Sequence, residues 1–289
     1  MAERMVETNG VELCTEAFGD PADPPILLVM GTGSSMLWWE DELCRMLADG
    51  GRFVIRYDHR DTGRSVSYEP GRPGYTSADL VGDAAGVLDG YGISAAHVVG
   101  MSMGGAIAQL LALEWSDCVS SLVLISTTPS GSGDDDFPPM SDGYARFAAS
   151  AEVDWSEPES VIAYLVDDSR ALTGDGRRFD EAGVRALAVA DVERARNIAS
   201  AQNHFALAGD EGRRERSAAI AAPTLVIHGS SDPLFPLGHG EALAREIPGA
   251  RLLTLEGAGH ELNRADWDAI VAAILEHTGG ATEGPRAQP

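Results

Sequence analysis

The sequence contains no lysine: all 21 of its basic residues are arginine, and 45 aspartate and glutamate residues outnumber them. The chain therefore has no lysine side chain for Schiff-base chemistry with a carbonyl substrate. The formal net charge of -24 repels phosphate backbones and anionic membrane surfaces, so we expect neither nucleic acid nor a membrane as a partner.

Cysteine is scarce, with three residues at Cys14, Cys44 and Cys118 and no C-x-x-C spacing among them. An odd number of widely separated cysteines does not build a disulfide framework or a zinc site. We expect Cys44 and Cys118 to be small core residues without reactive thiols. The acidic run Asp134–Asp136 lacks the spaced oxygen ligands of a calcium loop, so no metal or other cofactor is predicted.

Long apolar runs are also missing. No window approaches the length of a membrane span, and the polar first ten residues lack the apolar core of a signal peptide. We therefore expect a cytoplasmic protein, either a monomer or a homodimer. Its 289 residues suffice for one α/β domain, with or without an insertion.

Apolar β runs alternate with helical patterns over most of the chain, which predicts an α/β fold with a mostly parallel, eight-stranded sheet and helices on both faces. Asn9-Gly10 joins the first two strands as a hairpin. Strands are predicted at 4–8, 11–18, 26–30, 53–58, 119–126, 223–229 and 250–255, with one more entering at His97. Helices are predicted at about 37–49, 77–91, 237–247 and 265–277, with one more leaving at Gly105.

The alternation stops between residues 128 and 222. Periodic segments around 144–151, 158–172, 180–187 and 192–207 predict helices there, and no run predicts a strand. We interpret 128–222 as a helical cap inserted into a core domain formed by 1–127 and 223–278. Residues 279–289 are rich in glycine, proline and polar residues and are expected to form a flexible tail.

The stretch Gly100-Met-Ser102-Met-Gly104 lies between an apolar strand and an apolar helix. Such a turn, called a nucleophile elbow, needs glycines so that strand and helix can approach, and it holds the serine hydroxyl clear of the backbone. Ser102 is therefore the candidate nucleophile. The alternative is that Ser102 only caps the helix.

A serine hydroxyl becomes nucleophilic when a base removes its proton, and the base needs a third group to orient it. Asp232 and His260 each follow a predicted strand of the sheet. The carboxyl ends of parallel strands gather at one edge, so Ser102, Asp232 and His260 are predicted to form a catalytic triad. Alternatively, Asp232 only forms a turn before Pro233, and His260 only caps a helix.

An oxyanion hole requires two backbone N–H donors. We predict those of Met103, directly after the nucleophile, and of Thr32, in the loop Gly31–Ser35. That loop could instead bind phosphate, but it lacks the lysine and spacing of a Walker motif. The charged stretch Asp58–Ser65 is predicted to brace neighbouring loops. His204, in the cap, could contact substrate or be a buried interhelical residue.

The Gly-Met-Ser-Met-Gly-Gly motif, the contexts of Asp232 and His260, and the insertion between them resemble the capped α/β-hydrolases over nearly the whole chain. Three stretches resemble the aclacinomycin methylesterase group in particular: Leu28–Gly31, Ile55–Ser65 and Val87–Gly92. Many family members have histidine where this chain has Met30, which leaves a backbone oxyanion donor unaffected.

The resemblance implies that Ser102 attacks an ester carbonyl with His260 as the base, without a cofactor, and that the substrate is a small-molecule ester such as the methyl ester of a polyketide. Aromatic residues in the cap and beside the loop Gly31–Ser35, which we call the oxyanion loop, suit a bulky, apolar substrate. The candidates for its pocket, with His204, are Trp38, Trp39, Phe137, Tyr144, Phe147, Trp155, Tyr164 and Phe205. About two or three of these aromatic residues are expected to line the pocket, and the others to be core residues.

Three other functions remain open on the same scaffold. A cofactor-free haloperoxidase or perhydrolase, or a carbon-carbon bond hydrolase, would use the same triad on a different substrate. A protein that binds a ligand without turning it over is the third, because a fold alone does not imply catalysis.

Overall fold

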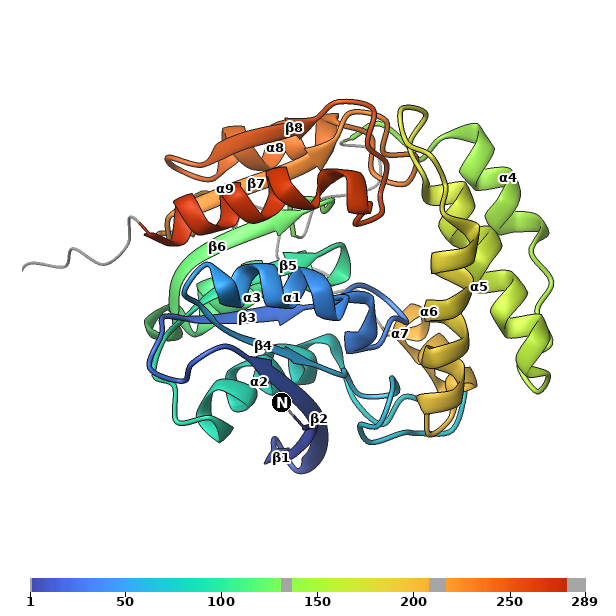
Figure 1. The fold of residues 1–289 in the computed structure, drawn as a ribbon, viewed down its shortest axis with the longest axis horizontal. Helices are drawn as coiled ribbons and strands as arrows, with labels where there is room; N and C mark the ends of the chain where they lie inside the picture. Colours follow the sequence, from blue (N-terminus) through green and yellow to red (C-terminus); the bar gives the residue numbers. More distant parts are fainter. Residues whose placement is uncertain (1, 131–136, 208–216, 280–289) are drawn as a thin grey trace, which may run out of the picture.

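An eight-stranded sheet forms the centre of the computed structural model, which describes residues 2–130, 137–207 and 217–279 (Figure 1). The strand order is β1-β2-β4-β3-β5-β6-β7-β8. β1 and β2 pair antiparallel, as do β2 and β4, and every later pair is parallel. The strands are β1 Arg4–Thr8, β2 Val11–Phe18, β3 Pro25–Val29, β4 Phe53–Tyr57, β5 Ala96–Met101, β6 Val119–Ile125, β7 Thr224–Gly229 and β8 Arg251–Leu255.

Helices cover both faces of the sheet, which confirms the predicted fold class. Alternate strand residues belong to separate cores: Leu27 packs in one and Leu28 in the other. The first core contains residues of α2 (Ser77–Gly90), α3 (Met103–Glu114) and α8 (Gly238–Glu246). The second contains residues of α1 (Asp41–Asp49) and α9 (Trp267–Gly279). Strands buried on both faces account for the continuous apolar runs in the sequence.

Among its described residues, the chain between β6 and β7 forms helices joined by loops, and no strand. The helices are α4 Asp142–Ser150, α5 Pro158–Leu172, α6 Glu181–Arg194, η4 Ile198–Gln202, α7 Asn203–Ala206 and η5 Ser217–Ala219. Those from α4 to α7 lie beside one end of the sheet (Figure 1), whereas η5 packs against α8. We refer to this part of the chain as the inserted helices, and to the described residues before and after it, which carry the sheet, as the sheet domain.

Two helix predictions were wrong in detail. α6 continues to Arg194, whereas a break was predicted between 187 and 192. The helix instead ends before Arg196, whose backbone N–H donates to the Gly63 carbonyl at 2.8 Å, and Asn197 then accepts from the Ala199 N–H to start η4. A contact with the sheet domain, which local periodicity does not record, therefore sets this boundary.

The predicted helix at 37–49 is divided into the 3-10 turn η1 (Met36–Trp38) and α1. Further 3-10 turns are η2 (Ser116–Cys118) and η6 (Arg264–Asp266). α9 includes Gly279, whereas the rest of the predicted tail, 280–289, and the acidic run Asp134–Asp136 lie outside the described residues.

The three cysteines lie in or against the core, as was expected for Cys44 and Cys118. Cys14 and Cys44 are buried, and burial raises the pKa of each thiol to about 12. Cys118 is half-buried and packs against the first core. Within the described ranges, no helix is long and apolar enough to span a membrane, and no group of three or more histidine, cysteine or acidic residues could hold a metal ion.

Candidate active site

Ser102 occupies a strained turn between β5 and α3. Its φ of +53° lies in the left-handed region that non-glycine residues rarely adopt. A Cβ at Gly100 would lie 2.2 Å from the Gly104 carbonyl oxygen, and one at Gly104 would lie 2.1 Å from the Val29 carbonyl oxygen. Strand and helix can meet here only because both positions lack a side chain. The strand, turn and helix of the predicted elbow are therefore present.

Replacing Gly104 with Ala is expected to destabilise the fold by about 3 kcal/mol or more, because the new methyl group overlaps the backbone of β3. Gly143→Ala is the matched control. A Cβ there meets only Ser141 Oγ at 3.8 Å, and alanine favours a helix over glycine by up to about 1 kcal/mol. Chemical denaturation measures both changes. Equal stability of the two variants would contradict the close contact at the elbow.

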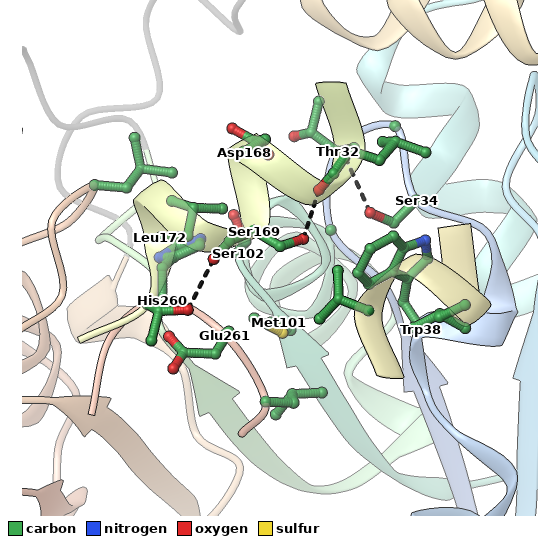
Figure 2. Close-up of a pocket in the computed structure, with 18 of the residues that line it drawn as sticks. Thr32, Ser34, Trp38, Met101, Ser102, Asp168, Ser169, Leu172, His260 and Glu261 are labelled. Atoms are coloured by element: carbon green, nitrogen blue, oxygen red, sulfur yellow. Dashed lines mark hydrogen bonds between the residues drawn. The ribbon is translucent and has the colours of Figure 1, made fainter. Parts of the chain in front are cut away.

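Ser102 borders a cavity of about 510 Å³ between the sheet and the inserted helices (Figure 2). On the sheet side, Thr32, Met101 and His260 line it as well. The wall contributed by the inserted helices is largely aromatic and aliphatic. It includes Tyr144, Trp155, Tyr164, Leu165, Leu172 and Leu187.

His260 and Asp232 form a buried pair at this end of the sheet. His260 Nδ1 lies 2.8 Å from Asp232 Oδ2, while Asp232 Oδ1 accepts the backbone N–H groups of Leu234 and Phe235 at 2.9 and 2.8 Å. Burial raises the pKa of Asp232, but the interactions with His260, with His228 and with the Phe235 N–H together outweigh burial and hold that pKa below its usual value. An ionised Asp232 accepts the Nδ1 proton, which leaves Nε2 of a neutral His260 as a proton acceptor.

The oxyanion loop lies directly over the serine: a Cβ placed at Gly31 would be 3.9 Å from Ser102 Oγ. Thr32 lines the cavity, and its backbone N–H has no hydrogen-bond partner among the described residues. Met103 is the first residue of α3, so no carbonyl of that helix can accept its N–H. Two N–H donors are therefore available beside the serine.

Trp38, a predicted pocket residue, lines the cavity and donates its Nε1–H to Asp191 Oδ2 at 2.7 Å. The pocket prediction was wrong for Trp39, which is 1% exposed and packs in the second core. Phe137 packs against the His239 ring, with centroids 5.1 Å apart, and is not among the described lining residues.

His204 also lies outside the described lining of the cavity, contrary to the pocket prediction. It is a buried residue of α7, and its Nδ1 lies 2.9 Å from the backbone nitrogen of Gly33. Its ring therefore contacts the oxyanion loop from behind and is not exposed to a substrate.

From α5, sequence reasoning named Tyr164 as a pocket candidate but missed other residues of the same helix. Leu165, Asp168 and Leu172 line the cavity from one face of this helix, and their helical spacing was the available signal. Asp168 accepts a hydrogen bond from the Tyr144 hydroxyl at 3.1 Å, and burial raises its pKa. The wall of inserted helices therefore carries one half-buried carboxyl group among apolar side chains.

The stretch Asp58–Ser65 braces loops, as predicted. Asp58 lies 2.7 Å from the Arg194 guanidinium of α6 and accepts the Met36 backbone N–H at 2.9 Å. Arg60 donates two hydrogen bonds of 2.7 Å to Asp83 on α2. These ion pairs, with the hydrogen bond from Met36, connect the inserted helices, the segment after the oxyanion loop and the sheet domain.

Comparison with known proteins identifies the family. A profile described as the alpha/beta hydrolase fold matches residues 24–263. The chain is 34% identical to rhodomycin D methylesterase DnrP of Streptomyces peucetius, over 98% of this chain and all of that protein. It is 35% identical to rhodomycin D methylesterase DauP of another Streptomyces, over the same shares.

A solved structure of similar extent is that of a hydrolase from Pseudomonas aeruginosa. It matches with a TM-score of 0.74 at 29% identity and covers 96% of this chain and 98% of that one. The family resemblance drawn from the sequence motifs is thereby confirmed. The chain belongs to the α/β-hydrolase fold family.

Proposed function

We propose that this protein is a serine hydrolase that cleaves carboxylic esters through an acyl-enzyme intermediate. The observation that carries the proposal is the convergence on one cavity of Ser102, held on a strained elbow, and His260, held by Asp232 at 2.8 Å. Similarity to two methylesterases over nearly the full chain supports the same reaction.

In this mechanism His260 Nε2 takes the Ser102 proton as Oγ attacks the ester carbonyl, and the Asp232 carboxylate stabilises the imidazolium that forms. The backbone N–H groups of Thr32 and Met103 hold the oxyanion. His260 then protonates the departing alcohol. A water molecule, deprotonated by the same residue, releases the acid and regenerates the serine.

The proposed substrate is a bulky, apolar ester, with the methyl ester of a polycyclic polyketide as the leading class. The cavity falls within the range of about 300–1,000 Å³ that is typical of sites for drug-sized ligands, and much of its wall is aromatic. Two relatives are named as methylesterases of rhodomycin D. We propose that residues 128–222 act as the cap that selects the substrate over a core of 1–127 and 223–278.

Ester chemistry is favoured over the alternatives on this scaffold. Haloperoxidase, perhydrolase and carbon-carbon bond hydrolase reactions would need the same triad, but the relatives that are 34% and 35% identical over nearly the whole chain are methylesterases. Nothing in this chemistry requires a membrane or a protein partner, so the proposal keeps the expected cytoplasmic monomer or homodimer.

A panel of methyl esters tests both the reaction and the substrate class. Methanol release is measured for methyl acetate, methyl benzoate, methyl 1-naphthoate and a tetracyclic aromatic methyl ester. From benzoate to the tetracycle, kcat/KM is expected to rise by about 10-fold or more, since burying some 50 Å² of additional apolar surface contributes about 1.3 kcal/mol.

Leu165→Trp, which narrows the cavity from α5, supplies the control. It should lower kcat/KM for the tetracyclic ester by about 10-fold and leave methyl acetate nearly unchanged. Absence of methanol release from every ester would refute the proposed reaction. Release from the small esters alone would refute only the bulky substrate.

A further inference from the structure

Two buried histidines hold the backbone of the oxyanion loop from its two ends. His59 Nε2 lies 3.0 Å from the Met30 carbonyl oxygen, and His204 Nδ1 lies 2.9 Å from the Gly33 nitrogen. The two rings also touch edge to face, with centroids 5.8 Å apart. One histidine comes from the sheet domain and the other from the inserted helices, so the loop is held by both parts of the molecule.

The hydrogen bonds fix the tautomer of each ring. A carbonyl oxygen only accepts, so His59 must carry its proton on Nε2. His204 Nε2 lies 2.8 Å from the Arg60 carbonyl oxygen and must donate to it, which leaves Nδ1 as the acceptor for the Gly33 N–H. Burial lowers the pKa of His204, and burial and the neighbouring His204 lower that of His59 to about 3. Both rings are therefore neutral, as this arrangement requires.

The Gly31–Thr32 peptide unit, which carries the Thr32 N–H, lies between two peptide units that hydrogen bonds hold in place. On one side, the Met30–Gly31 peptide is held through its carbonyl; on the other, the Thr32–Gly33 peptide is held through its N–H. Gly33 adopts φ +70°, which bends the loop at this point. Because three consecutive peptide planes share their Cα atoms, fixing the outer two limits the rotation of the Thr32 N–H between them.

The segment bearing His204 is itself anchored to the sheet domain. Asn203 donates to Asp61 at 2.8 Å and accepts the Gly71 N–H at 2.6 Å. Ser200 donates to the Tyr68 carbonyl oxygen at 2.6 Å. The His204 ring thus has a fixed position relative to the oxyanion loop, which a positioning role needs.

We propose that His204 is a positioning residue for the oxyanion hole: its Nδ1 holds the Gly33 N–H so that the Thr32 N–H stays directed at the oxyanion formed above Ser102. This proposal rests on the proposed ester hydrolysis. The inserted helices thereby support the catalytic step as well as cover the cavity.

Two substitutions separate the two hydrogen bonds of the ring. In His204→Asn, the side-chain oxygen takes the place of Nδ1, so the bond to Gly33 can persist while that to Arg60 is lost. In His204→Gln, the amide nitrogen takes the place of Nε2, so the bond to Arg60 can persist while that to Gly33 is lost. His97→Gln is the control. His97 is a buried residue of β5, away from the loop, and its Nδ1 lies 2.8 Å from Ser121 Oγ of β6.

For a p-nitrophenyl ester, His204→Gln is expected to lower kcat by about 10- to 100-fold with little change in KM, because a displaced oxyanion donor weakens transition-state binding alone. His204→Asn should retain kcat within about 5-fold of wild type, and His97→Gln should leave it unchanged. The affinity for a trifluoromethyl ketone, which forms a tetrahedral adduct with serine, should fall with kcat.

Amide hydrogen exchange at Gly33 gives a readout that does not depend on turnover, and it should accelerate in His204→Gln but not in His204→Asn. The positioning role would be overturned if His204→Asn lost as much kcat as His204→Gln, or more. It would also be overturned if the Gly33 exchange rate were unchanged in His204→Gln. Wild-type protein that is inactive on every ester would instead refute the proposed function. The exchange result would still show whether His204 holds the Gly33 N–H. Thermal unfolding of each variant identifies any general loss of structure.

Discussion

Ester hydrolysis by Ser102→Ala is expected to fall by about 10⁶-fold in kcat, equivalent to about 8 kcal/mol of transition-state stabilisation. Without Oγ, no acyl-enzyme can form, and His260 and Asp232 have no nucleophile to serve. The residual rate would come from substrate binding and the oxyanion donors alone. Binding should persist, because alanine removes one oxygen from a cavity that keeps its other walls.

Covalent labelling by a fluorophosphonate probe measures the same hydroxyl without a substrate. Wild type should carry one label, mapped by mass spectrometry to the peptide containing Ser102, and Ser102→Ala should carry none. Ser116→Ala, at an exposed serine beside β6, should behave as wild type in both assays. Full activity or full labelling of Ser102→Ala would refute Ser102 as the nucleophile.

The sheet and the elbow could be predicted because their determinants are local. Buried parallel strands require continuous apolar runs, and the Asn9-Gly10 dipeptide supplies the two positive φ angles of the hairpin, +47° and +76°. The clash that a Cβ at Gly100 would cause lies within the motif itself. The alternation also predicts parallel strands, whose carboxyl ends share one edge of the sheet, and this places Asp232 and His260 near Ser102.

Pocket residues were harder to predict because a local pattern does not say which neighbour faces the cavity. Trp38 and Trp39 are adjacent and chemically identical, yet the 3-10 turn η1 directs Trp38 toward Asp191 and buries Trp39 in the core. That turn is fixed partly by Asp58, whose carboxylate accepts the Met36 N–H. The deciding contacts come from other parts of the fold.

His204 shows the same limit for function. Its sequence context allowed either substrate contact or burial, and neither described its bond to Gly33, a residue 171 positions away. The end of α6 likewise depends on the distant Gly63 carbonyl. Contacts between the inserted helices and the sheet domain thus carry the information that the sequence pattern lacks.

Asp232→Asn is expected to lower kcat by about 10⁴-fold while leaving the fold intact, the size of effect seen when the same change is made in a serine protease triad. The side-chain oxygen of asparagine can still accept the Leu234 and Phe235 N–H groups. Its NH₂ group must then face His260 Nδ1 and donate to it. The histidine proton is displaced to Nε2, the atom that should receive the Ser102 proton, so the base is lost through its tautomer.

Asp232→Ala provides the comparison, because it removes the loop hydrogen bonds together with the carboxylate. Its melting temperature should fall below that of Asp232→Asn, although both variants lose catalysis. Nitrogen-15 chemical shifts of His260 report the tautomer directly, with protonation at Nδ1 expected in wild type and at Nε2 in Asp232→Asn. A loss of less than about 10-fold in Asp232→Asn would show that orientation by Asp232 contributes little to the reaction, and unchanged His260 shifts would remove the tautomer as its cause.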